Sequence, residues 1–237
     1  MDDYFYPTTD ASFDAAAFAA HGGGKTLPDF RRQELNKLVA GLYKMTKKVN
    51  RNLLFGISPA GEYDRVMNVH YADLDTWCSQ EGYLDYICPQ VYFGLKHQHS
   101  PYVATCQRFQ SALKNPNIDL IIGMTLGKAI AKNDQYAGTG KTEWAESRDI
   151  LKRCLESTKD LERCRGVAYF CYQYFYDPVS GAPRGETAEE RANFIPVLKE
   201  ITWKQGEELS KGSKTAKKAK TSSKKKTSKK SQRSRDD

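Results

Sequence analysis

The sequence lacks the patterns that mark a membrane-spanning segment or a metal site. No apolar run reaches the roughly 20 residues that a transmembrane helix needs, and no positive stretch followed by an apolar leader opens the chain. The six cysteines occur singly, with no CxxC pair and no histidine at ligand spacing. We therefore expect no metal, no cofactor and no disulfide framework, and we expect free, mostly buried thiols.

The positive charge of the chain is confined to its C-terminus. The 237 residues carry a formal charge of +8, but 12 of the 37 basic residues and only two of the 29 acidic residues lie between Lys211 and Asp237. That segment therefore has a net charge of +10, and the remaining residues have a net charge of −2. A body so close to neutral does not indicate a nucleic-acid-binding domain.

The basic segment also lacks aromatic residues, and alanine is its only apolar residue type up to Lys230. Because it has too little apolar surface to offset the entropy of ordering it, we predict a disordered tail over 204–237 that follows a folded domain over 1–203. Two interpretations stay open: a solvated tail, and a segment that binds DNA, RNA or an anionic polymer nonspecifically by counterion release. Without stacking aromatics, sequence-specific recognition is not expected.

Two hydrophobic periods alternate along the rest of the chain. Helical spacing predicts helices over 35–49, 70–81, from Pro101 onward with Val103 on the buried face, over 143–157 and over 187–201. Between them lie short, nearly continuous apolar runs that predict buried strands: LLFGI, LDYICPQVYF, DLIIGMTL and GVAYFCYQYF. Strands of this kind, separated by amphipathic helices, indicate a parallel α/β sheet covered by helices. With the opening DDYFYP counted as a strand end, the chain contains five βα units of the size found in (β/α)₈ barrels.

Several motifs together resemble the bacterial glycoside-hydrolase-like family 10. In the family's order, and covering nearly all of residues 2–180, they are DDYFYPTTD at 2–10, FGISPAG at 55–61, EGYLDYICPQVYFG at 81–94, DLIIGMTLGK at 119–128, EWAESRDILKR at 143–153 and the closing GVAYFCYQYF.

The resemblance implies that these stretches form strands four to eight of a TIM barrel. We therefore expect a partial (β/α)₈ barrel, with Met1 inside the fourth strand and three earlier units needed to complete the domain. The family also implies a polysaccharide substrate of the bacterial cell surface. An extracytoplasmic or cell-envelope location would follow if the full-length protein has a leader, and a cytoplasmic location otherwise.

Glycoside hydrolysis requires two carboxyl groups on either side of the scissile bond, and a TIM barrel presents its catalytic groups at the C-terminal ends of its strands. Asp2 and Asp3 stand at such an end, but adjacent strand residues point to opposite faces, so only one of them should face the cleft. We favour Asp3 slightly over Asp2. Glu62, after the SPAG turn, is the candidate partner, and Asp177 is a weaker one. The alternative for both is a solvated loop acid or a helix cap.

Further side chains at predicted strand ends are candidates for substrate binding. Aromatic rings pack against the C–H faces of sugars, and amides and hydroxyls bind their hydroxyl groups, although ordinary core packing explains many of the aromatics. The candidates are Tyr4, Ser58, Gln90, Tyr92, Lys128, Tyr172 and Tyr174.

Two glycine-rich stretches imitate the end of a phosphate-binding P-loop. GGGKT at 22–26 and GTGKT at 138–142 both lack the first glycine of that motif, since Ala19 and Gln135 occupy its position, and neither directly follows a strand. We interpret both as surface loops. The sequence thus favours a glycoside hydrolase over two alternatives, an inactive carbohydrate-binding barrel fragment and a basic-tailed polyanion-binding protein.

Overall fold

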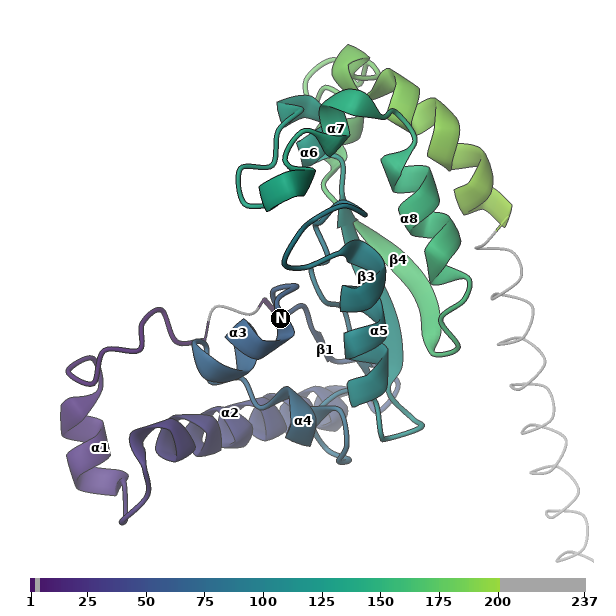
Figure 1. The fold of residues 1–237 in the computed structure, drawn as a ribbon. Helices are drawn as coiled ribbons and strands as arrows, with labels where there is room; N and C mark the ends of the chain where they lie inside the picture. The colour runs from purple at the N-terminus through teal and green to yellow at the C-terminus, as the bar shows by residue number, and fades with distance from the viewer. Residues whose placement is uncertain (3–4, 201–237) are drawn as a thin grey trace, which may run out of the picture. The chain divides into compact units, whose positions relative to one another are not determined.

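The apolar runs predicted as strands pair in chain order to form a parallel sheet. The computed structural model describes residues 1–2 and 5–200, and the sheet has the order β1-β2-β3-β4 with every pair parallel (Figure 1). The strands are β1 Gly56–Ile57, β2 Tyr86–Ile87, β3 Asp119–Thr125 and β4 Cys164–Phe170. The mixed α/β architecture and the parallel sheet confirm the coarse prediction and are consistent with a partial barrel.

The chain divides into two units, Met1–Val197 and Leu198–Asp237. All of the sheet belongs to the first unit. The predicted boundary at residue 203 and the predicted basic tail both lie outside the described residues, so they stay predictions.

The first two strands are much shorter than their apolar runs. In LLFGI only Gly56 and Ile57 pair with β2, and the preceding Leu54 is 72% exposed. By contrast, β3 and β4 pair along six residues, from Leu120 with Cys164 to Thr125 with Phe170. The prediction of a buried strand beginning at Leu53 was therefore wrong at its N-terminal end.

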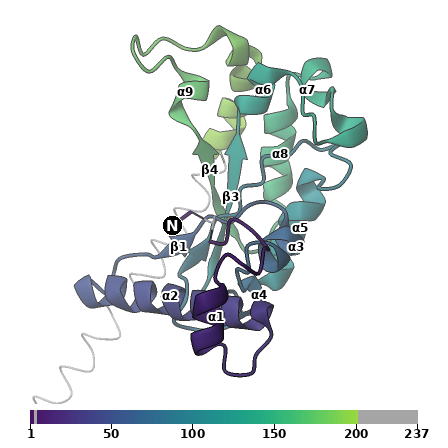
Figure 2. The same ribbon diagram turned by 90° about the vertical axis from the view of Figure 1, so that its left-hand side faces the viewer.

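The opening of the chain extends the sheet beyond β1. The Ser58 amide donates a 2.8 Å hydrogen bond to the Met1 carbonyl, and the Met1 ammonium donates to the Gly56 carbonyl at 2.9 Å. Asp2 forms a parallel bridge with Ser58. The first residues thus lie alongside β1 in strand-like pairing, as expected for a strand end (Figure 2).

Nine α-helices and two 3₁₀ helices have bounds within the described residues. They are α1 Ala15–His21, α2 Leu27–Val49, α3 Tyr63–Asn68, α4 Leu74–Trp77, α5 Tyr102–Ala112, α6 Gly127–Ala131, η1 Gly138–Gly140, α7 Glu143–Glu146, α8 Ile150–Thr158, α9 Tyr172–Phe175 and η2 Gly185–Thr187. Residues 188–197 are also helical, as predicted. Helices α5 and α8 pack against each other beside β3 and β4, covering one face of the sheet (Figures 1 and 2).

The predicted helix over 70–81 was wrong. Within that range only α4 is helical: α3 already ends at Asn68, and between the two helices Tyr71 adopts a left-handed φ of 56°. Asp73 then starts α4 as its N-cap, since its carboxylate accepts a hydrogen bond from the Thr76 amide at 3.2 Å. A capping aspartate inside an apolar periodic stretch is a local start signal that outweighs the period.

The predicted helix over 143–157 is interrupted. Helix α7 ends before Ser147, whose backbone is extended, and α8 begins at Ile150. The buried Glu190 carboxylate accepts hydrogen bonds from the Ile150 and Leu151 amides at 3.1 and 3.0 Å, and burial raises its pKa. A residue 40 positions away in the chain therefore satisfies the first turn of α8.

The cysteines agree with the sequence prediction, and Val103 does not. All six cysteines are free and four of them are buried, whereas Val103 lies on the exposed side of α5 and not in the core. Neither glycine-rich stretch directly follows a strand: one lies between α1 and α2, and the other includes η1. Within the described part of the chain, no helix has both the length and the apolar content needed to cross a bilayer.

A buried arginine ties the N-terminal segment to helix α2. The Arg31 side chain is fully buried and forms a two-pronged ion pair with Asp14, with nitrogen to oxygen distances of 2.6 and 3.0 Å. It also donates to the Asp10 carbonyl at 2.7 Å, and its guanidinium carbon lies 4.9 Å from the ring centroids of both Tyr6 and Tyr71. Charge, hydrogen bonds and ring contacts thus converge on one side chain.

Replacing Arg31 by Leu should lower the free energy of unfolding by about 3–5 kcal/mol, because it leaves the nearly buried Asp14 carboxylate unpaired. Denaturation in urea measures this loss. Arg32→Leu is the matched control, since Arg32 is partly exposed and its ion pair with Asp29 is 3.6 Å long; it should cost less than about 1 kcal/mol.

The same ion pair predicts a pH dependence. The hydrogen bond from Arg31 holds the pKa of Asp14 below its ordinary value, so the stabilisation is present above the ordinary aspartate pKa, about 3.9, and is lost as the pH falls. Asp14→Asn should therefore flatten the acid limb of the stability profile. Equal losses of unfolding free energy in Arg31→Leu and Arg32→Leu would contradict a special contribution of the ion pair between Arg31 and Asp14.

Candidate active site

Three residues predicted from strand ends meet at the carboxyl edge of the sheet. The side-chain amide of Gln90 donates a 2.7 Å hydrogen bond to the Asp2 carboxylate and a 3.1 Å hydrogen bond to the Ser58 carbonyl. Asp2 and Ser58 are also bridge partners. The structure therefore brings together residues that are 88 positions apart in the chain and fixes one carboxylate between two strand ends.

Gln90 can reach this position because its own backbone continues the sheet. It bridges Ala60 on one side and Gly123 on the other, both in parallel fashion, just past the end of β2. Gly123 has no side chain, and a Cβ there would lie 2.7 Å from the Pro89 carbonyl oxygen. The close approach of the two backbones thus requires glycine.

Aromatic rings line the ends of the next strands. The Tyr92 ring stacks on Phe170 with centroids 5.9 Å apart, and Phe170 meets Tyr174 edge to face at 6.1 Å. Tyr174 also packs against Gly127, where a Cβ would lie 3.0 Å from its ring. Phe170 is the last residue of β4, a strand in which only Cys164 is buried, and it is 53% exposed. We call Tyr92, Phe170 and Tyr174 the aromatic row.

The remaining substrate-binding candidates are placed differently. Tyr172 was expected at a strand tip, but it begins the helical turn α9 and stacks on Tyr176 with centroids 5.3 Å apart. Lys128, in α6, forms a 2.8 Å ion pair with the buried carboxylate of Asp134. The charge of Lys128 is therefore already compensated within the protein.

Glu62 lies at the start of α3, where it occupies the N-cap position without a capping hydrogen bond from its side chain. Its carboxylate is 3.8 Å from Arg65 and lines a cavity between α3 and α5. Asp177, the weaker alternative, accepts hydrogen bonds from the Val179 and Ser180 amides in an exposed turn, and the contacts with Ser180 lower its pKa. A general acid needs a raised pKa, so the surroundings of Asp177 do not suit that role.

Asp3 and Tyr4 lie outside the described residues, so their predicted roles stay predictions. Among the residues that are described, no group of three or more metal-binding side chains comes together.

Sequence reasoning missed two residues of this region. Phe170 was part of a quoted apolar run, but the phase of β4 that exposes it depends on pairing with β3. Asp134, the partner of Lys128, lies in a loop with no periodic pattern. The only available signal was the spacing of six residues between an acid and a base, which is too common to be informative.

A parallel α/β sheet that carries a fixed carboxylate and a row of partly exposed aromatic rings at its carboxyl edge has the layout of a TIM-barrel type of site. The model of the glycosyl hydrolase-like 10 family matches residues 1–138, and the chain belongs to this family.

Two curated relatives agree with that membership. Glycosyl hydrolase YngK of Bacillus subtilis is 27% identical over 190 residues, which cover 72% of this chain and 36% of the relative. Glycosyl hydrolase DigH of Escherichia coli O6:H1 is 28% identical over 197 residues, which cover 75% of this chain and 44% of the relative. The chain thus spans less than half the length of the curated relatives that it matches.

The role of Gln90 can be tested by amide exchange. In Gln90→Ala the Asp2 carboxylate and the Ser58 carbonyl lose their shared donor, so the strand-like pairing of Met1 and Asp2 with β1 should open more often. We expect hydrogen exchange at the Ser58 amide to accelerate at least about 10-fold, as measured by NMR.

The Gly123 amide is the internal control, because its 2.8 Å hydrogen bond to Pro89 has the same length as the bond from Ser58 to Met1 but does not involve the Gln90 side chain. Equal acceleration at both amides would mean that the substitution loosens the whole sheet, which would overturn the local role.

Proposed function

We propose that this chain is the C-terminal part of a (β/α)₈ barrel, over residues 1–203, that hydrolyses glycosidic bonds in a bacterial or cell-surface polysaccharide. The observation that carries the proposal is the Asp2 carboxylate, which Gln90 holds at the carboxyl edge of the sheet. That edge is where TIM-barrel enzymes carry their chemistry. Membership of the glycosyl hydrolase-like 10 family supports a glycosidase-like role.

In this proposal the pair Asp2/Asp3 supplies one catalytic carboxyl group and Glu62 supplies the second. One group protonates the leaving oxygen, and the other attacks the sugar or activates water. The aromatic row supports the proposal as a platform for sugar rings, because Phe170 is exposed at the same edge of the sheet and the half-buried Tyr92 and Tyr174 pack against it. Ser58 and Gln90 would bind sugar hydroxyl groups, with Tyr4 and Tyr172 as further contacts, whereas Lys128 is already paired with Asp134.

A complete (β/α)₈ barrel needs βα units beyond those of this chain. The relatives are more than twice as long as the region they share with this chain. We propose that three further βα units, corresponding to the N-terminal half of the barrel, complete the cleft. If the chain acts without them, a carbohydrate-binding role without hydrolysis is the second candidate, favoured by the aromatic row alone.

The chemistry is tested by replacing Asp2 and Asp3 separately with Asn. Asparagine keeps the size of the side chain but removes its negative charge and its titratable proton. In a chain that carries the complete barrel, the variant of the cleft-facing aspartate should release reducing ends from a glycan at least about 100-fold more slowly. The variant of its neighbour should mainly change stability.

Glu62→Gln then tests the second carboxyl group, and a loss of similar size would assign Glu62 to the acid/base pair. Glu156→Gln is the matched control and should leave hydrolysis unchanged, because Glu156 is as exposed as Glu62 and forms a similarly long ion pair, 4.0 Å with Lys152, but lies on α8 outside the cavity. Undiminished hydrolysis in both Asp2→Asn and Asp3→Asn would remove the catalytic assignment of this strand end, whereas absence of hydrolysis by the unsubstituted complete barrel would leave carbohydrate binding as the better proposal.

We further propose that the basic segment Lys211 to Asp237 contacts polyanions nonspecifically. Its charge of +10 contrasts with the net charge of −2 in the remaining residues. Deleting residues 211–237 should abolish binding to DNA or heparin and leave glycan binding unchanged, since attraction to a polyanion requires charge density. Fluorescence anisotropy at several salt concentrations measures the loss.

A variant of the same length, with all 12 basic residues of the segment replaced by Gln, separates charge from chain length and should behave like the deletion. Polyanion binding that survives either change, or that does not weaken as salt rises, would contradict this assignment.

A further inference from the structure

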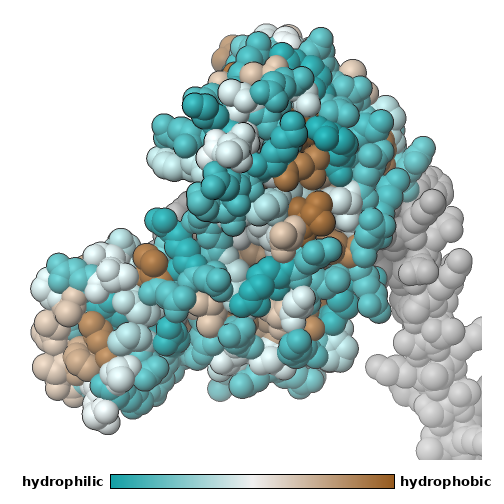
Figure 3. Space-filling model, in the orientation of Figure 1, coloured by the Kyte–Doolittle hydropathy of each residue, from teal (hydrophilic) through white to brown (hydrophobic). Residues whose placement is uncertain are grey.

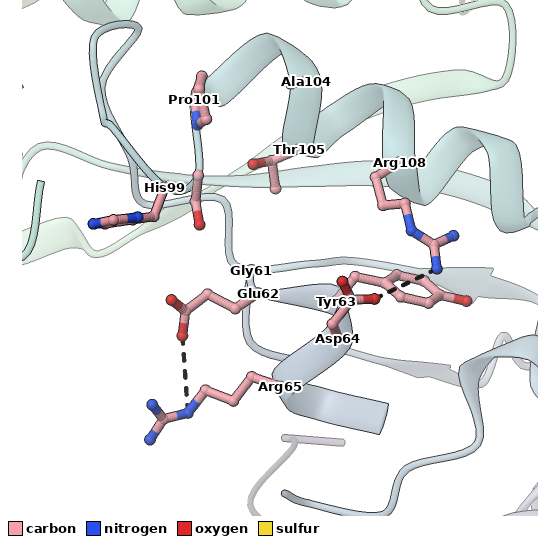
Figure 4. A pocket seen from close by; sticks show the side chains of 11 residues that line it. Gly61, Glu62, Tyr63, Asp64, Arg65, His99, Pro101, Ala104, Thr105 and Arg108 are labelled. Atoms are coloured by element: carbon pink, nitrogen blue, oxygen red, sulfur yellow. Dashed lines mark ion pairs between the residues drawn. The ribbon is translucent and has the colours of Figure 1, made fainter. Parts of the chain in front are cut away.

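A cavity of about 490 Å³ lies between α3 and α5, beside the candidate active site. Figure 4 shows Pro101, Thr105 and Arg108 on the side of α5, and Glu62, Asp64 and Arg65 on the side of α3. The volume lies within the range of small-molecule sites. The face of the protein that carries α3 and α5 is mostly hydrophilic, with hydrophobic side chains in separate small patches (Figure 3). The cavity therefore suits a polar ligand better than an apolar one.

Arg108 is held in place by an aromatic platform. Its guanidinium carbon lies 3.7 Å from the centroid of the Tyr63 ring, close enough for stacking. Tyr63 is 4% exposed and donates a 2.6 Å hydrogen bond to Asp75, so the platform itself is fixed. Packing on the Tyr63 ring thus positions Arg108, and this contact leaves the N–H groups of Arg108 available for hydrogen bonds.

The acidic partners of the two cavity arginines engage them only weakly. Arg108 approaches Asp64 at 3.6 Å, and Asp64 is 86% exposed; Arg65 approaches Glu62 at 3.8 Å, and both side chains are exposed. Neither guanidinium donates a hydrogen bond to any residue that the structure describes. Long, solvent-exposed pairs of this kind contribute little free energy, so a ligand can displace them at low cost.

Two guanidinium groups with available donors favour an anionic ligand. The planar fork of arginine matches the geometry of a carboxylate, which it binds with two parallel hydrogen bonds. Helix α5 begins at Tyr102, next to the cavity, so its positive dipole end adds to the same preference. Pro101 and Ala104 add apolar surface on which the C–H face of a sugar ring can pack.

The cavity begins where the candidate active site ends. Gly61 belongs to its lining, and a Cβ at that position would lie 2.6 Å from the Gln90 carbonyl oxygen. Gln90 is the residue that holds the Asp2 carboxylate. A glycan bound at the strand ends would thus have the two arginines in the direction of α3 and α5.

We propose that the cavity between α3 and α5 binds the carboxylate of an acidic sugar residue, with Arg108 as its ligand. This inference rests on the proposed function, since it specifies that the glycan carries carboxylate groups. Asp64 opposes such a ligand by charge, and that opposition gives the test a predicted sign.

The experiment measures binding of glucuronate, glucose and inorganic phosphate to the full chain by isothermal titration calorimetry. Glucuronate differs from glucose only in having a carboxylate in place of the terminal hydroxymethyl group. Glucuronate should bind at least about 10-fold more tightly than glucose, and Arg108→Gln should remove that advantage, because it eliminates a two-pronged charge-assisted contact. Asp64→Asn should tighten glucuronate binding about two- to three-fold, because it removes a nearby like charge.

Arg165→Gln is the matched control. Arg165 has about the same exposure as Arg108 and a 3.4 Å ion pair with Asp119, but it lies on β4 outside the cavity. Its replacement should leave glucuronate binding unchanged, and thermal unfolding should confirm that every variant is folded. Attraction of glucuronate to the basic tail would be common to all variants, so it cannot produce the predicted differences between the variants.

Three outcomes would overturn the proposal. Equal binding of glucose and glucuronate would remove the role of the carboxylate, and weaker binding of glucuronate in Asp64→Asn would show that Asp64 contributes to binding and does not oppose the ligand by charge. Phosphate that displaces glucuronate at equal concentration would indicate an anion site without preference for sugars. Because no hydrolysis is measured, failure here leaves the Asp2 and Asp3 tests standing, and failure of those tests leaves this cavity unaffected.

Discussion

The buried guanidinium of Arg31 is the contact on which the N-terminal part of the protein depends. Removing such a charge from water is costly, and the cost is met only because Asp14, the Asp10 carbonyl and two tyrosine rings surround it. These contacts hold residues 6–14 against α2. The position of Arg31 therefore limits where the N-terminal residues can lie, and so limits how the Asp2 carboxylate reaches Gln90.

Much of the fold could be predicted because the apolar runs are local signals. DLIIGMTL and GVAYFCYQYF correspond to β3 and β4, and the order and parallel direction of the sheet follow from the alternation with helices. The helix boundaries failed where a distant or nonperiodic group intervenes. The cap of α8 comes from Glu190, and the break before α4 depends on the left-handed backbone at Tyr71. Neither is visible in a hydrophobic period.

The candidate site was predictable to a similar degree. The rule that catalytic groups lie at strand ends selected Asp2, Ser58 and Gln90, and the structure brings them together. It does not bring Lys128 to an open position, because Asp134 already binds it. The two cavity arginines were not selected at all, since single charges on helix surfaces usually face solvent, and only the packing of Arg108 on Tyr63 distinguishes it.

The unequal lengths of the strands determine which part of the sheet unfolds first. Six residue pairs join β3 to β4, but only two join β1 to β2. Cooperative loss of structure starts where the fewest interactions must break together. The edge that carries Asp2 can therefore detach while the β3 and β4 end remains intact, so a protein that still looks folded by its overall secondary structure can already have lost its candidate catalytic carboxylate.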